Sequence, residues 1–180
     1  MYGNDNMIYP TMDLSGCNYK KEIIDGVEKL KHKTPLIIDE PDFSNNSYMV
    51  DINEKIFENS YISIVSETLF FSNDNIFFSE KLTKTIECFH PFILVSTPKS
   101  LEKLRRLGFK TFSPWIDEKY DTIMDHWQRL YAIKNEILRL SKLNKKQIRK
   151  LYNAVQDQIN HNYENLKKFE GDVVKTKTFL

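Results

Sequence analysis

Short apolar runs alternate with polar segments in the middle of this chain, and their spacing switches between that of strands and that of helices. Residues 61–66 (YISIVS) are β-branched and aromatic, which is typical of a strand. Residues 92–96 (FILVS) are almost continuously apolar, as expected of a parallel strand covered on both faces. Residues 109–112 (FKTF) predict a third strand.

Two helices are predicted between these strands. Ser79 can cap a helix over 80–89. Ser100 can cap a second helix over 100–107, and Gly108 is suited to end it in the left-handed conformation. Strand, helix, strand, helix, strand at this spacing indicates parallel strands joined by right-handed crossovers. The predicted fold class is therefore α/β, with a Rossmann-like parallel sheet and flanking helices.

The N-terminal part predicts a shorter set of elements. Residues 20–33 place apolar side chains at helical spacing, which predicts a short amphipathic helix. Residues 34–39 (TPLIID) predict a buried strand, residues 40–47 a loop, and residues 53–60 a helical turn or two. We expect residues 1–33 to be an N-terminal extension with that short helix.

Long helices are predicted for the C-terminal part. Residues 125–140 place their large apolar side chains largely on one stripe. Asn144 and Gln147 form a plausible capping pair, and apolar positions then recur at helical spacing as far as Phe169, over about six turns. We expect one domain over 34–170, followed by a tail at 171–180.

Composition narrows the class of protein. The 180 residues are enough for one core, and 41% are hydrophobic, which indicates a globular chain. No apolar run approaches the roughly 20 residues that span a bilayer, so no membrane partner is expected. Cys17 and Cys88 form no disulfide framework and no metal-binding spacing. A reducing, cytoplasmic setting is expected.

Charge is distributed unevenly along the chain. Residues 1–80 hold 14 acidic and 6 basic residues, a net of −8, and residues 81–180 hold 11 acidic and 20 basic residues, a net of +9. The sign changes at Lys81. An anionic ligand held by the second half is one interpretation, and two faces of opposite charge that attract each other, or a partner chain, is the other.

The stretch Ser79-Glu80-Lys81 carries the clearest candidate chemistry. With Ser79 as the N-cap, Lys81 falls in the first helical turn, where the positive end of the helix dipole opposes an ammonium. Backbone N–H groups, dipole and ammonium would then converge as they do in phosphate sites. Glu80 could accept hydrogen bonds from ribose hydroxyls. The alternative is a solvated lysine with no ligand.

Two quoted stretches resemble a known family. Residues 61–95, "YISIVSET…FFSEKLTKTIECFHPFILV", resemble the C-terminal, donor-binding half of GT-B glycosyltransferases, most closely the α1,3-fucosyltransferase type. Together with "LRRLGFKTFSPWIDEKYD" (104–121), they are also similar to glycosyltransferase-like proteins of phages and marine microbes. The resemblance covers roughly residues 34–166.

The resemblance implies a role for a few residues. Glu80 matches a family glutamate that holds the ribose, Lys81 a lysine that contacts the diphosphate, and Glu67 the glutamate of a Glu-Asn pair. Thr68 replaces the asparagine of that pair and Ser79 replaces a threonine, which puts the choice of base and sugar in doubt. The implied donor is a nucleoside-diphosphate sugar, with no metal and no further cofactor. No catalytic residue is assigned.

A complete GT-B enzyme has a second half that binds the acceptor, and about 33 residues before the first strand cannot form it. We therefore expect a donor half alone, with an acceptor-binding partner chain or a missing N-terminal domain, and no sugar transfer by the chain alone. The alternative is a non-catalytic binding or structural module, possibly phage-encoded, that keeps the fold. A nucleic-acid-associated protein ranks third.

Other residues have simpler interpretations. Asp39, Glu40 and Asp42 fit an acidic turn better than a metal motif. His90 fits a hydrogen-bonded structural role better than catalysis, and Trp115 fits packing better than stacking on a ligand. The basic run at 142–150 (KLNKKQIRK) lacks interleaved aromatic residues, so a solvated helix surface is favoured over nucleic-acid binding.

Overall fold

The computed structural model describes residues 17–31, 54–72 and 75–177, in two compact units, Met1–Pro41 and Asp42–Leu180. In the first unit, α1 (Lys20–Lys31) confirms the predicted amphipathic helix. The strand predicted at 34–39 and the loop predicted at 40–47 lie outside the described residues, so the domain boundary at 34 stays a prediction.

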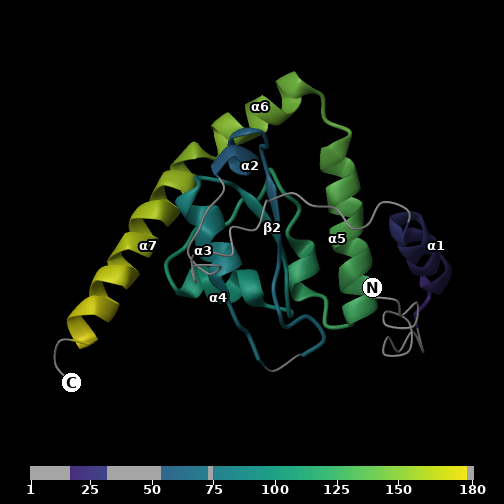
Figure 1. Ribbon diagram of the computed structural model, residues 1–180, viewed down its shortest axis with the longest axis horizontal. Helices are drawn as coiled ribbons and strands as arrows, with labels where there is room; N and C mark the ends of the chain where they lie inside the picture. The colour runs from purple at the N-terminus through teal and green to yellow at the C-terminus, as the bar shows by residue number, and fades with distance from the viewer. Residues whose placement is uncertain (1–16, 32–53, 73–74, 178–180) are drawn as a thin grey trace, which may run out of the picture. The chain divides into compact units, whose positions relative to one another are not determined.

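The second unit is mixed α/β and mostly helical, around a small parallel sheet. β1 (Ser63–Ser66) pairs with β2 (Phe92–Val95) in parallel, in a register that places Ser63 opposite Phe92. The helix α3 (Glu80–Glu87) makes the crossover between them (Figure 1). Both strands, their parallel pairing and the helix between them confirm this part of the predicted α/β fold.

The core lies on both faces of β2. Phe92, Ile93 and Leu94 are all buried, as predicted for a strand covered on both faces. β1 is covered on one face: Val65 is 3% exposed, whereas its neighbour Ile64 is 54% exposed. α3 buries its apolar face, and it packs against β1 and against the last helix, α7 (Gln156–Lys177).

The strand predicted at 109–112 is wrong. The N–H and C=O of Lys110 bond to the amide of Asn162, at 2.7 and 2.8 Å, so they are not available to a neighbouring strand. On β2, the N–H of Leu94 donates to the hydroxyl of Tyr120 at 3.3 Å instead of to a strand. Phe112 is nevertheless buried, at 1% exposure. The described part of the chain therefore forms two of the three predicted parallel strands, and a full Rossmann-like sheet is not seen in it.

The predicted cap of the second crossover helix is also wrong. α4 (Ser100–Arg106) includes Ser100 as its first residue, and the N-cap is Lys99, in a left-handed conformation, φ 64°. Ser100 instead donates its hydroxyl to the carbonyl of Thr97 at 2.7 Å. The first turn is capped from a distance by Asp121. At the other end, Gly108 has the predicted left-handed conformation, φ 84°.

Three helices follow. Asn144 and Gln147 form the predicted capping box. The single long helix predicted beyond them is interrupted at Val155, whose N–H bonds to the carbonyl of Tyr152 in a tightened turn. The last helix continues to Lys177, into the segment predicted as a tail.

The remaining helical elements are α2 (Glu54–Glu58), η1 (Lys119–Thr122), α5 (His126–Ser141), α6 (Lys145–Ala154) and α7 (Gln156–Lys177). None of the described helices combines the length and apolar character needed to cross a membrane.

Candidate functional site

The end of β1 and the start of α3 are joined by one buried carboxylate. Glu67, 5% exposed, follows the last residue of β1. Its two carboxylate oxygens accept the backbone N–H of Ser79, at 3.1 and 3.0 Å. Two of the candidate residues predicted from the sequence are therefore brought into direct contact at the carboxyl end of the strand.

Ser79 has the predicted capping role. Its hydroxyl accepts the N–H of Lys81 at 3.2 Å, and its backbone is extended. The ammonium of Lys81 lies 3.4 Å from the Ser79 hydroxyl and 3.4 Å from a carboxylate oxygen of Glu80. The side chains of Lys81 and Glu80 are 50% and 43% exposed, so solvent and ligands can reach both. The remaining candidate, Thr68, is exposed on the loop between Glu67 and Ser79.

The local field favours negative charge in this first turn. The pKa of the Glu80 carboxyl lies below its ordinary value, chiefly because its own backbone N–H donates to it, and Lys81 and then Lys84 add to the effect. Glu80 is therefore ionised at neutral pH. An anionic ligand here would compete with Glu80 for the helix N-terminus and for the Lys81 ammonium.

A groove of about 440 Å³ runs beside Lys81, along β1. Lys81 and Lys84, three residues apart on α3, both line it. Residues of β1 from Ser63 to Ser66 form the facing wall. Its described lining includes two lysines and no carboxylate, and Glu80, which pairs with Lys81 at 3.4 Å, is not part of that lining.

His90 is structural, as predicted. Its Nε2 lies 2.8 Å from the carbonyl of Phe57, and its Nδ1 lies 3.0 Å from the hydroxyl of Ser63. Because a carbonyl only accepts, Nε2 carries the proton and Nδ1 accepts from Ser63. Burial lowers the pKa of the His90 imidazole, so the ring is neutral and both of its nitrogens are occupied.

Sequence reasoning missed Arg129. This side chain is 1% exposed and lies at the carboxyl ends of both strands. Its guanidinium donates to the carbonyls of Ser96 and Phe70, at 3.2 and 2.6 Å, and to two more carbonyls in the 123–124 turn. It therefore fixes the loops that follow β1 and β2. In the sequence, the only sign of this buried role is that Arg129 stands between apolar residues of α5. An arginine in a helix is ordinarily expected on the protein surface.

No metal site is formed by the described residues, which contain no cluster of three or more histidine, cysteine or acidic side chains. Trp115 is 36% exposed and accepts a hydrogen bond from Arg139 at its carbonyl, at 2.9 Å. The acidic motif of residues 39–42 lies outside the described part of the chain.

Comparison with known proteins identifies no relative: no protein-family model, no curated protein and no solved structure matches this chain.

Proposed function

We propose that this chain binds a nucleoside-diphosphate sugar beside the first turn of α3 and serves as the donor-binding part of a glycosyltransferase. The observation that carries the proposal is the groove along β1, in which Lys81 and Lys84 face strand residues without carboxylates. Its volume, about 440 Å³, lies within the usual range of small-ligand sites.

Each candidate residue has a defined part in the proposal. The Lys81 ammonium pairs with the diphosphate and stabilises it as a leaving group. Glu80 accepts hydrogen bonds from ribose hydroxyls once the phosphate has taken its place beside Lys81. Glu67 and Ser79 hold the first turn in position, and Thr68, on the exposed loop between them, contacts the base or sugar.

A competing function follows from a specific observation. Glu67 is buried, and both of its carboxylate oxygens accept the N–H of Ser79. The Ser79 hydroxyl already caps α3. These contacts would be the same in a protein in which they serve only to stabilise the fold. On that alternative the chain is a non-catalytic binding or structural protein, and it has no affinity for nucleotides.

Calorimetric titration with UDP and GDP distinguishes the two. Lys81→Ala is expected to weaken binding by about 1.5–3 kcal/mol, the usual value of a hydrogen bond to a charged group, which is roughly 10- to 150-fold. Glu80→Ala is expected to weaken it less and to reduce the preference for a nucleoside diphosphate over pyrophosphate, because neutral hydroxyls make weaker bonds.

Lys103→Ala is the matched control. Lys103 is an exposed lysine on α4 and does not line the groove. Its replacement removes the same charge and should leave nucleotide affinity unchanged. The proposal fails if the unmodified protein binds neither UDP nor GDP at millimolar concentration, or if both lysine variants lose affinity equally.

A further inference from the structure

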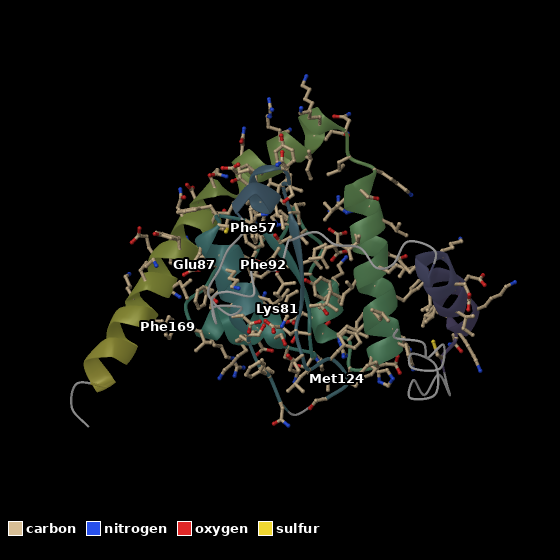
Figure 2. The ribbon with its side chains drawn as sticks, in the orientation of Figure 1. Phe57, Lys81, Glu87, Phe92, Met124 and Phe169 are labelled. Atoms are coloured by element: carbon tan, nitrogen blue, oxygen red, sulfur yellow. The ribbon has the colours of Figure 1, made fainter. Side chains whose placement is uncertain are left out.

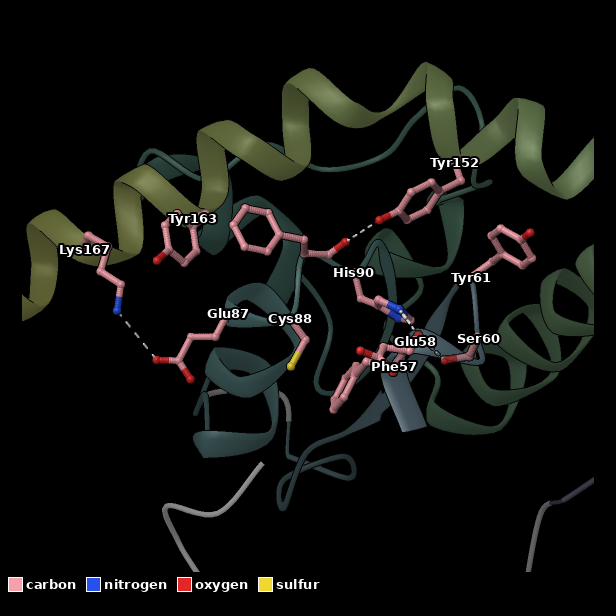
Figure 3. Close-up of a pocket in the computed structure, with 11 residues that line it drawn as sticks. Phe57, Glu58, Ser60, Tyr61, Glu87, Cys88, His90, Tyr152, Tyr163 and Lys167 are labelled. Atoms are coloured by element: carbon pink, nitrogen blue, oxygen red, sulfur yellow. Dashed lines mark hydrogen bonds and ion pairs between the residues drawn. The ribbon is translucent and has the colours of Figure 1, made fainter. Parts of the chain in front are cut away.

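A second cleft lies at the other end of α3, beside the turn that leads into β2 (Figure 3). Its volume is about 680 Å³. Lys81 and Glu87 mark the two ends of α3 (Figure 2), and only Glu87 lines this cleft. Since α3 has 8 residues, its length of about 12 Å separates Lys81 from the cleft. The cleft adjoins the groove along β1, because Phe57 and Ser60 line both.

Aromatic rings make up much of its lining, in two linked pairs. Tyr61 and Tyr152 meet edge to face, with ring centroids 5.9 Å apart. Phe89 and Tyr163 are stacked at 4.4 Å. The hydroxyl of Tyr152 donates to the carbonyl of Phe89 at 3.2 Å, which joins the pairs. Phe89 is 39% exposed and the three tyrosines are half-buried, so ring surface is open to a ligand.

Phe89 is held in an unfavourable backbone conformation, with φ 54°. Its N–H bonds to the carbonyl of Ile86, and the N–H of His90 bonds to that of Thr85, both at 3.1 Å. These two bonds define a helix end at which the left-handed residue is usually glycine. A bulky aromatic residue in this position is an outlier. Such outliers concentrate at ligand sites, where the side chain is needed in spite of its backbone.

Cations lie on the same helices as two of the rings. Lys145 and Arg149 precede Tyr152 by seven and three residues on α6, so all three share one face of that helix, and both cations are exposed. At the other end, the Lys167 ammonium lies 5.4 Å from the centroid of the Tyr163 ring and 4.0 Å from Glu87. The basic run 142–150 contains no aromatic residue, but Tyr152 follows it on α6 and the fold brings Tyr61 against Tyr152.

We propose that this cleft and the adjoining face of α6 bind single-stranded nucleic acid. Exposed aromatic rings stack on bases whatever their identity, and cations beside them neutralise phosphates, which is the combination that single-strand-binding surfaces use. The bases lie on Tyr61 and Phe89, and the phosphates lie against Lys145, Arg149 and Lys167. The site adjoins the proposed nucleotide-sugar site at Phe57 and Ser60 but includes neither Lys81 nor Lys84.

Two carboxylates limit where the phosphates of a bound nucleic-acid strand can lie. Glu58 and Glu87 also line the cleft, so its own lining has a net charge of −1 with Lys167. Phosphates therefore run along α6 past Lys145 and Arg149, and reach the cleft only at Lys167. A single strand, whose unstacked bases can enter the cleft, fits this arrangement of charges better than a duplex. In a duplex the phosphates lie on the outside and the bases are enclosed.

Fluorescence anisotropy with fluorescein-labelled oligouridylate and oligothymidylate of about 12 nucleotides tests the proposal. Binding to one or both is expected, more tightly than to a duplex of the same length, and the two probes separate an RNA ligand from a DNA ligand. With three phosphate contacts, the logarithm of the affinity should fall against the logarithm of salt concentration with a slope of about −2.

Two pairs of substitutions give the decisive comparison. Lys145→Gln with Arg149→Gln should weaken binding by about tenfold or more at low salt. Lys146→Gln with Lys150→Gln removes the same charge from α6, one residue further round the helix and away from the Tyr152 face. This control should change the affinity by less than about twofold.

Aromatic substitutions test the stacking. Tyr61→Ala should weaken binding by about 5- to 150-fold, the usual range for one base stacked on an aromatic ring. Tyr131→Ala, on α5 and outside the cleft lining, should have no effect. Lys81→Ala should also keep full affinity, which separates a failure here from a failure of the proposed nucleotide site.

The proposal is overturned if no single strand binds at about 100 μM protein, a concentration at which even nonspecific binding is usually detected. It is equally overturned if both charge pairs reduce affinity to the same extent, because attraction to α6 would then be general. Should Tyr61→Ala fail to fold, the two charge pairs still decide, since all four of those side chains are exposed.

Discussion

Glu67 accepts the backbone N–H of Ser79 through both of its carboxylate oxygens, at 3.1 and 3.0 Å, across 12 positions of sequence. The bond closes the loop between β1 and α3 and holds the first turn of that helix against the end of the strand. The placement of Lys81 beside the groove thus depends on a residue that does not line it.

Replacing this carboxylate should destabilise the fold. Glu67→Ala leaves the N–H of Ser79 buried without an acceptor, so we expect the free energy of unfolding to fall by about 1.5–3 kcal/mol. Glu67→Gln keeps one acceptor oxygen and should lose less. Glu80→Ala is the control, because that side chain is 43% exposed. Urea denaturation measures all three, and equal stability of Glu67→Ala and Glu80→Ala would contradict the role of this bond.

A second prediction concerns the cap that α4 receives from a distance. The carboxylate of Asp121 accepts the N–H groups of Leu101 and Glu102, at 2.8 and 3.0 Å. Asp121→Ala leaves both donors without a partner and should lower the free energy of unfolding by about 1–3 kcal/mol. Asp117→Ala, which removes a half-exposed carboxylate from the same loop, should cost less than about 1 kcal/mol. Thermal unfolding measures both variants, and equal melting temperatures would contradict the capping role of Asp121.

The pattern along the chain predicts burial better than it predicts pairing. Phe109 and Phe112 are both buried, yet the segment is not a strand. What decides this is the amide of Asn162, more than fifty positions away, which takes both backbone groups of Lys110. Local spacing carries no information about such a contact. Ser100 failed as a cap for the same reason, because Asp121 reaches its helix from further along the chain.

The candidate site was predicted in part because its contacts are local. Ser79 caps α3 two residues away, and a cap of this kind is visible in the sequence. The meeting of Glu67 with Ser79 follows once β1 and α3 are placed. The groove along β1 and the aromatic cleft could not be predicted in this way. Tyr61, Phe89 and Tyr163 come from three separate segments, and only packing brings them together.

His90 should make stability depend on pH. Burial lowers the pKa of its imidazole in the folded protein, so the unfolded chain, with an ordinary pKa of 6.5, takes up the proton first as pH falls. Stability from this residue is thus present above pH 6.5 and is lost below it, by up to about 1.4 kcal/mol for each unit until the folded pKa is reached.

Urea denaturation between about pH 7.5 and 5.5 measures this effect. His90→Asn should be less stable than the unmodified protein at the upper end, because contacts to Phe57 and Ser63 are lost. The difference between the two proteins should shrink as pH falls. A difference that stays constant across this range would mean that His90 takes up a proton equally easily in both states.

The conformation of Phe89 leads to the last prediction, which separates its backbone from its ring. With φ 54°, this residue occupies a region that glycine enters without strain and that other residues enter at a cost of about 1 kcal/mol or more. Phe89→Ala removes the ring stacked on Tyr163 and keeps the strain, so it should destabilise the protein. Phe89→Gly removes both the ring and the strain, so it should be more stable than Phe89→Ala by about 1 kcal/mol.

Since both variants lose the ring, both should lose affinity for single-stranded nucleic acid to the same degree. Urea denaturation and anisotropy on the same two proteins test this. If glycine and alanine give equal stability, the left-handed conformation of Phe89 costs nothing, and the cleft loses one of the observations that mark it as a binding site.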